Sequence, residues 1–225
     1  MSSLPKELFS FFKKLENNNN REWFNDNKPQ FKNIESQVKV FGENLKNVLE
    51  SSEKVDEFKL FRVYRDVRFS KNKTPYKTHF GLSFHREKPE FRGGYYVHLK
   101  PNDNFIAVGF WNPNKEDLLR IRKELELDSS EFRELMEVPK FKNVWGLLEG
   151  EELKTAPKGF SKEDPNIDLI RKKMFLFKKK YTDTEVLASN FIDQVAQDFI
   201  TVRPFLDYMS SVLTTDLNGV SLLEK

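Results

Sequence analysis

The sequence has no cysteine among its 225 residues, which excludes disulfides, thiolate nucleophiles and zinc sites built on thiolates. It also lacks any apolar run close to the roughly 20 residues that cross a bilayer. Its first residues show no basic segment followed by an unbroken apolar one, as a secretory signal would. No glycine-rich phosphate loop precedes a predicted helix. From these absences we expect a soluble, cytoplasmic protein.

Neither sign of charge dominates the chain. Its 38 lysines and arginines face 35 acidic residues, and the formal net charge is +3. This balance argues against a dedicated nucleic-acid coat or a polybasic membrane binder. Apolar side chains, in contrast, are plentiful: they make up 38% of the residues and include 22 phenylalanines. The composition therefore supports a substantial core, and the length suits one domain over residues 1–225.

The spacing of apolar residues predicts an α+β fold. Within residues 1–53, apolar residues recur at intervals of three and four, which is typical of helices. From about residue 58 to residue 111 the pattern alternates, which predicts an antiparallel sheet of four or more strands packed against N- and C-terminal helices. Residues 113–215 are expected to be mainly helical, with late helices at 167–177 and 185–213. A long loop at 149–166 is a candidate functional flap.

Basic residues are concentrated in one part of the predicted sheet. The segment 60–86 contains seven basic residues and one acid, a local charge of +6, whereas the remainder of the chain carries −3. Alternation places all three histidines of the chain on the polar sides of neighbouring strands. If the strands pair in sequence order, these histidines converge with Arg62, Arg68 and Lys77 on one face of the sheet.

These residue types suit an anionic ligand. Arginine offers a planar fork that matches phosphate or carboxylate, lysine offers a mobile point charge, and histidine transfers protons near neutral pH. We predict a basic cleft that binds, and in an enzyme turns over, a phosphorylated or carboxylated small molecule. The predicted anion-binding residues are Arg62, Arg65, Arg68, Lys71, Lys73, Lys77 and Tyr96. Of these, Lys71 and Lys73 lie in a predicted turn and are expected to gate the cleft.

The predicted catalytic residues, for the case that a reaction occurs, are His79, His98 and Asp66. The arginine neighbours of Asp66 are expected to lower its pKa, which weakens it as a general base. No spacing of the histidines matches a known zinc pattern, so we expect neither a metal nor another cofactor.

Three alternatives stay open. Antiparallel sheets commonly leave one polar face to water, and such a face needs no function. Residues 64–80 are predicted to form two strands and a turn, a basic hairpin. This hairpin is compatible with nucleic-acid binding, with the Ser70–Thr74 turn along a nucleic-acid backbone and Tyr76 or Tyr96 stacking on bases. It is also compatible with a non-enzymatic module that docks an acidic protein.

Arg65 does not fit regular alternation: it requires either a β-bulge or a buried, paired side chain.

The strings "FRVYRDVRFSKNKTPYKTH", "GYYVHLKP", "GFWNP" and "PKGF", in this order, resemble a bacterial and fungal family, domain of unknown function 2461. "NNREWFNDNK" fits the same family, and the resemblance spans roughly residues 4–213. It implies no particular activity. It does imply that the characteristic motif includes Arg62, Arg65, Asp66, Arg68, Ser70, Lys71, Lys73, Pro75, Tyr76 and Lys77. Such a polar motif favours function over packing.

One position departs from the family pattern. After the "PKGF" loop the relatives typically read Asp-His-Pro, whereas this chain reads Glu163-Asp164-Pro165. This puts in doubt any mechanism that needs a histidine there.

Overall fold

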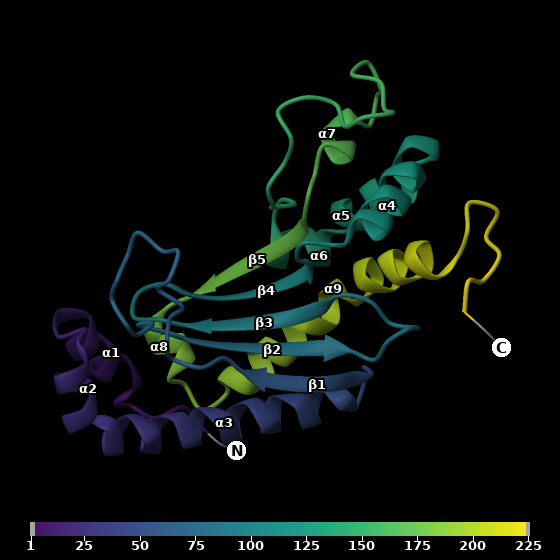
Figure 1. Ribbon diagram of the computed structural model, residues 1–225. Helices are drawn as coiled ribbons and strands as arrows, with labels where there is room; N and C mark the ends of the chain where they lie inside the picture. Colours follow the sequence, from purple (N-terminus) through teal and green to yellow (C-terminus); the bar gives the residue numbers. More distant parts are fainter. Residues whose placement is uncertain (1–2, 224–225) are drawn as a thin grey trace. The chain divides into compact units, whose positions relative to one another are not determined.

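A five-stranded antiparallel sheet is the centre of the fold. It is seen in a computed structural model that describes residues 3–223. The strands pair strictly in sequence order, so each lies beside its predecessor (Figure 1). Helices precede and follow the sheet in the chain, and the α+β prediction is confirmed. The strands are β1 (Val55–Leu60), β2 (Phe80–Arg86), β3 (Gly94–Leu99), β4 (Asn104–Phe110) and β5 (Phe175–Tyr181).

The predicted N-terminal helices are present, and the apolar residues that recur at intervals of three and four are buried along one side of each. The second and longest of them packs along β1. Asn20 caps the short helix between them, because its side chain accepts a hydrogen bond from the Trp23 amide at 2.9 Å. The helices of the chain are α1 (Leu8–Asn17), α2 (Arg21–Asp26), α3 (Lys28–Glu50), α4 (Lys115–Leu127), α5 (Ser130–Glu137), α6 (Pro139–Trp145), α7 (Ile167–Ile170), α8 (Asp183–Val186) and α9 (Phe191–Thr214).

The prediction of a helix over 167–177 is wrong beyond its first turn. Helix α7 ends at Ile170, and Phe175–Tyr181 is the fifth strand. Phe175 and Phe177 are both fully buried while Leu176 between them is only half-buried, which is the period-2 burial of a strand. The predicted loop 149–166 is present, and bridges to Leu176 and Lys172 fix its start. Pro204 lies inside α9 without dividing it.

The motif segment is not the pair of regular strands that the alternation predicted. Strand β1 ends at Leu60, β2 begins at Phe80, and residues 61–79 form a loop that we call the basic loop. Its two arms are joined by one bridge, between Tyr64 and Tyr76. The ring of Tyr76 stacks on Phe24 at 3.9 Å, and the Asn19 side chain bonds both backbone polar groups of Tyr76, at 3.0 and 3.1 Å. A side chain thus takes the place of a neighbouring strand.

The chain divides into two compact units, each assembled from three segments. The first comprises residues 1–84, 96–106 and 180–197, and the second comprises residues 85–95, 107–179 and 198–225. Each has an aromatic core of its own: Phe12, Phe31 and Phe80 pack together in the first, and Phe132, Phe177 and Phe205 in the second. That the chain forms one domain stays a prediction. Within residues 3–223, no helix is long and apolar enough to cross a membrane.

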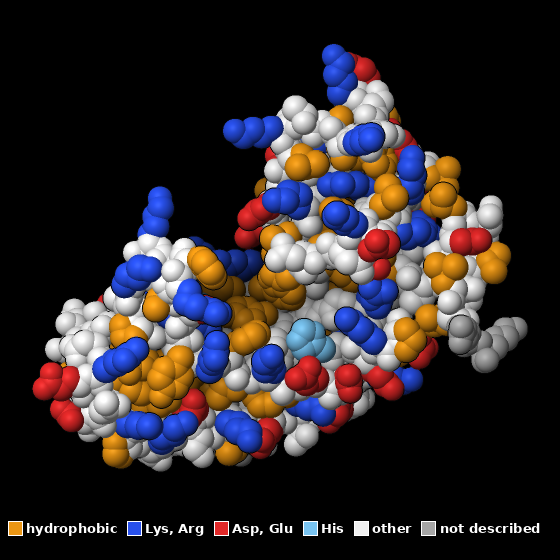
Figure 2. Space-filling model, viewed as in Figure 1, with side chains coloured by type: hydrophobic (Ala, Val, Ile, Leu, Met, Phe, Trp, Pro, Cys, Tyr) orange, Lys and Arg blue, Asp and Glu red, His pale blue; other side chains and the backbone are white. Residues whose placement is uncertain are grey.

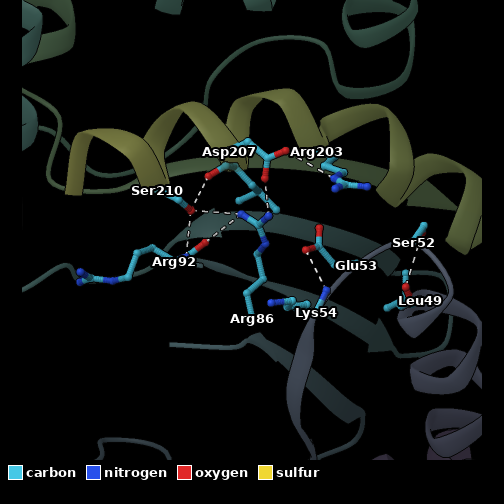
Figure 3. Close-up of polar contacts among 10 residues, drawn as sticks. Leu49, Ser52, Glu53, Lys54, Arg86, Arg92, Arg203, Asp207 and Ser210 are labelled. Atoms are coloured by element: carbon cyan, nitrogen blue, oxygen red, sulfur yellow. Dashed lines mark hydrogen bonds and ion pairs between the residues drawn. The ribbon is translucent and has the colours of Figure 1, made fainter. Parts of the chain in front are cut away.

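A buried arginine organises polar contacts in the second unit. The Arg86 side chain, at the end of β2, is wholly buried and donates to the Asp207 carboxylate of α9 (Figure 3). It also donates to Ser210 Oγ at 3.2 Å and to the Arg92 carbonyl at 3.4 Å. A buried charge is tolerated only when it is paired and hydrogen-bonded, and these contacts meet that condition.

We predict that Arg86→Ala lowers the free energy of unfolding by about 3–5 kcal/mol, because it removes a wholly buried side chain together with its hydrogen bonds to Asp207, Ser210 and the Arg92 carbonyl. The matched control is Arg203→Ala. Arg203 contacts the same carboxylate at 3.4 Å but is 46% exposed, and its loss should cost about 0–1 kcal/mol. Urea denaturation of both variants makes the comparison. Equal losses would contradict the prediction.

Candidate functional site

The tip of the basic loop is closed by its own hydrogen bonds. Asn72 Oδ1 accepts from the Thr74 amide at 2.9 Å and from the Thr74 hydroxyl at 2.7 Å. The Lys73 ammonium donates to the Val67 carbonyl at 2.9 Å. Lys71 is exposed beside it. Figure 2 shows lysine and arginine side chains beside hydrophobic ones where Figure 1 draws this loop. Of the two predicted gate lysines, Lys73 is therefore engaged in a hydrogen bond to the backbone of the loop itself.

The predicted anion ligand Arg68 already has a carboxylate partner. Its guanidinium donates two hydrogen bonds to Asp66, at 3.0 and 2.6 Å, and both side chains are exposed. Hydrogen bonding from Arg68 lowers the pKa of Asp66, and the charge of Arg62 adds to the effect. Asp66 is thus a weak base, as its neighbours in the sequence predict, and Arg68 is less available to an external anion.

Three other cations lie together without an ion pair to an acid among the described residues. We call Arg62, Arg65 and Lys77 the cation cluster. Burial lowers the pKa of Lys77, and the charges of Arg62 and Arg65 lower it further. Within residues 3–223, none of the three forms an ion pair, and their one side-chain hydrogen bond joins Arg65 to Thr74 Oγ1 at 3.4 Å.

Arg65 follows neither of the two alternatives drawn from the sequence. It lies in the loop rather than at a bulge of a strand, and it is half-buried without a carboxylate. Its amide donates to the Pro75 carbonyl at 2.9 Å, across the two arms of the loop. Its charge acts on Lys77 and on His79, and it lowers the pKa of both.

Two of the three histidines converge. The rings of His79 and His98 lie 4.3 Å apart, and His98 stacks on Phe105 at 4.5 Å. The Tyr96 hydroxyl is 3.0 Å from His98 Nδ1. His79, directly before β2, is thus brought to His98 and Tyr96 on the neighbouring strand β3. His85, the third histidine, is exposed near the end of β2.

Burial keeps two of these groups neutral near neutral pH. It lowers the pKa of His79 from its ordinary value of 6.5 to about 4, with added effects from the charges of Lys77, Lys100 and Arg65. Burial also raises the pKa of Tyr96 to about 12. At neutral pH His79 accepts a proton or a hydrogen bond at one ring nitrogen, and Tyr96 stays a phenol.

Several residues of this surface do not emerge from the sequence pattern. Alternation assigns Phe61 to an apolar face, yet the side chain is 36% exposed and lies 5.7 Å from each of the ammoniums of Lys59 and Lys77. Ser83 is buried, and its hydroxyl has no hydrogen-bond partner in the described part of the chain. A signal for Lys59 and Phe61 existed: two residues apart at the end of a strand, they share a face.

No group of three or more histidine, aspartate or glutamate side chains in residues 3–223 is arranged to hold a metal ion. The groups that this surface offers are cations, the neutral imidazole of His79 and aromatic rings.

Comparisons with known proteins give one match. Residues 7–208 match the family model described as conserved hypothetical protein (DUF2461). Searches of curated proteins and of solved structures return no match.

The pKa of His79 makes stability depend on pH. Between pH 6.5 and about 4 the unfolded chain binds a proton at this histidine and the folded chain does not. Stability from His79 is therefore complete above pH 6.5 and decreases as the pH falls, by about 1–2 kcal/mol after allowance for solvent screening. Urea denaturation at about pH 7 and about pH 4.5 should show a smaller loss for His79→Gln than for the wild type. An identical loss in both would contradict this.

Proposed function

The chain belongs to the DUF2461 family of conserved hypothetical proteins, and we propose that it binds a phosphorylated or carboxylated small molecule at the cation cluster. The observation that carries the proposal is that Arg62, Arg65 and Lys77 form no ion pair within residues 3–223. The comparisons name a family without an activity, so the proposal rests on the site alone.

The physical argument concerns Lys77. Loss of hydration and repulsion from two guanidinium groups both disfavour its charged form, and both lower its pKa. A bound anion reverses both effects, because it replaces the lost hydration with hydrogen bonds and offsets the repulsion. Each charge-assisted hydrogen bond contributes about 1.5–3 kcal/mol. Three cations therefore suffice for useful affinity after ordering costs.

Within the proposal, the roles of the predicted residues differ. Arg62, Arg65 and Lys77 hold the anion, because Arg68 is engaged by Asp66. For turnover we assign the proton transfer to His79 or His98. His79, with a pKa of about 4, is neutral at physiological pH; it is a weak base there and accepts a hydrogen bond from the ligand.

The test is the binding of inorganic phosphate, followed by calorimetry and by the shift in melting temperature. We expect Lys77→Gln to weaken binding at least about tenfold, because it removes one charge-assisted hydrogen bond. Affinity should fall as the pH rises through the lowered pKa of Lys77, since only the ammonium binds an anion.

The matched control for this test is Lys46→Gln. Lys46 is also half-buried, but it pairs with Glu50 at 3.3 Å on α3, and its replacement should leave phosphate binding unchanged. Equal weakening in the two variants, or no binding to the wild type, would refute the proposal.

A second candidate function, binding of single-stranded nucleic acid, is favoured by one observation. Phe69, at the tip of the basic loop, is 97% exposed. Exposed aromatic rings beside cations serve as stacking platforms for bases. Of the two tyrosines expected to stack, Tyr76 is 4% exposed and already stacked on Phe24, and Tyr96 is half-buried.

For this second candidate we predict that Phe69→Ser weakens binding of a short single-stranded RNA about tenfold, because a stacked base is lost. The control Leu147→Ser alters another exposed apolar side chain, 81% exposed, and should have no effect. Filter binding at several salt concentrations provides the measurement, and affinity should fall steeply with salt. Absence of retention at low salt would eliminate the candidate.

A further inference from the structure

The anion site lies against an aromatic surface rather than an open polar one. Phe61 contacts two lysines of the site, with Lys59 Nζ and Lys77 Nζ each 5.7 Å from its ring centroid. Lys59, like Lys77, forms no ion pair in the described part of the chain. A ligand held by these two ammoniums therefore lies beside the ring of Phe61, and the ring is 36% exposed.

Further rings continue from Phe61 across the sheet. Its ring centroid is 6.3 Å from that of Tyr96, and Tyr96 is 5.9 Å from Phe105. Tyr96 and Phe105 are both half-buried. We call Phe61, Tyr96 and Phe105 the ring platform. Centroid separations of this size are those of interacting aromatic pairs. The successive rings are tilted by 55° and 44°, and Phe105 stacks on His98, so Phe61 is the ring left to contact a ligand beside the lysines.

A glycine on β2 makes room for the ring platform. A Cβ atom at Gly81 would lie 2.5 Å from the Tyr96 hydroxyl oxygen and 3.2 Å from Phe61 Cδ2. Both contacts are shorter than ordinary van der Waals separations. Two rings thus close over a position where the strand has no side chain, and any other residue at 81 would displace one of them.

An unsatisfied hydroxyl lies on the same face of β2. Ser83 follows Gly81 by two residues, so its side chain points to the same side of the strand, about 7 Å further along. It is 7% exposed, and its Oγ has no hydrogen-bond partner among the described residues. Buried polar groups normally have partners. Because this oxygen is itself buried, a ligand on the surface does not reach it.

From these contacts we infer that the ligand is an aromatic anion, an aryl phosphate or an aromatic carboxylate. The inference rests on the proposed function and adds its ligand class. The anionic group contacts the cation cluster and Lys59, and the planar ring lies against Phe61, the member of the ring platform that touches both lysines. A polyhydroxylated group such as a sugar would need hydrogen-bonding side chains along its length, where the ring platform offers mainly carbon.

The test compares three anions by calorimetry: inorganic phosphate, cyclohexyl phosphate and phenyl phosphate. We expect phenyl phosphate to bind about tenfold more tightly than either of the others, because only it stacks on aromatic rings. Phe61→Leu should reduce this preference to less than about twofold. Phe61→Tyr, which keeps an aromatic ring at this position, should retain the preference for phenyl phosphate.

The outcomes separate the inference from the proposal on which it rests. If phosphate binds and phenyl phosphate binds no more tightly than cyclohexyl phosphate, the ligand class is wrong and the anion site stands. If none of the three binds to the wild type, both fail. If Phe61→Leu weakens all three equally, Phe61 has only a structural part and the inference is overturned.

Discussion

The basic loop depends on how Tyr76 is held. Its ring stacks on Phe24 at 3.9 Å, and Asn19 bonds its backbone amide and carbonyl at 3.1 and 3.0 Å. On either side of Tyr76, the Pro75 carbonyl and the Lys77 amide bond the opposite arm of the loop. Lys77 follows directly and is therefore placed beside Arg62 and Arg65, although the three charges repel one another. Packing and hydrogen bonding at one tyrosine thus maintain an arrangement that electrostatics alone opposes.

The repulsion in the cation cluster is only partly relieved within the chain. The ring of Phe61 attracts two ammoniums through its quadrupole, a contribution of about 0.5–1 kcal/mol for each at an exposed site. The pKa of Lys77 is lowered nevertheless, with burial as the largest cause. The same positive charges help to lower the pKa of His79 to about 4. A bound anion would offset the positive charges that act on both Lys77 and His79. The electrostatics of the basic loop and of the histidine pair are therefore coupled.

Sequence patterns predicted the structure correctly where the spacing of buried residues distinguishes a helix from a strand. The stripe in α3 and the meeting of His79 with His98 both follow from spacing and strand order. The basic loop was not predictable in this way: its alternation resembles a strand, but the partner of Tyr76 is the side chain of Asn19, 57 residues earlier. Strand β5 was missed because a short run of phenylalanine and lysine fits either period. Phe61 was misplaced because the strand before it ends at Leu60.

The charge pattern of the first unit bears on whether its basic loop is merely a solvated surface. On α3 of the same unit, lysines are paired with glutamates one turn away: Lys32 with Glu35, Lys39 with Glu43 and Lys46 with Glu50. A solvated face normally mixes the two signs in this manner. The basic loop has a single acid, Asp66, and that acid is held at the exposed tip by Arg68. Arg65 and Lys77 are half-buried and form no ion pair within residues 3–223; burial without a carboxylate is costly for a cation, and a site kept open for an anion accounts for it.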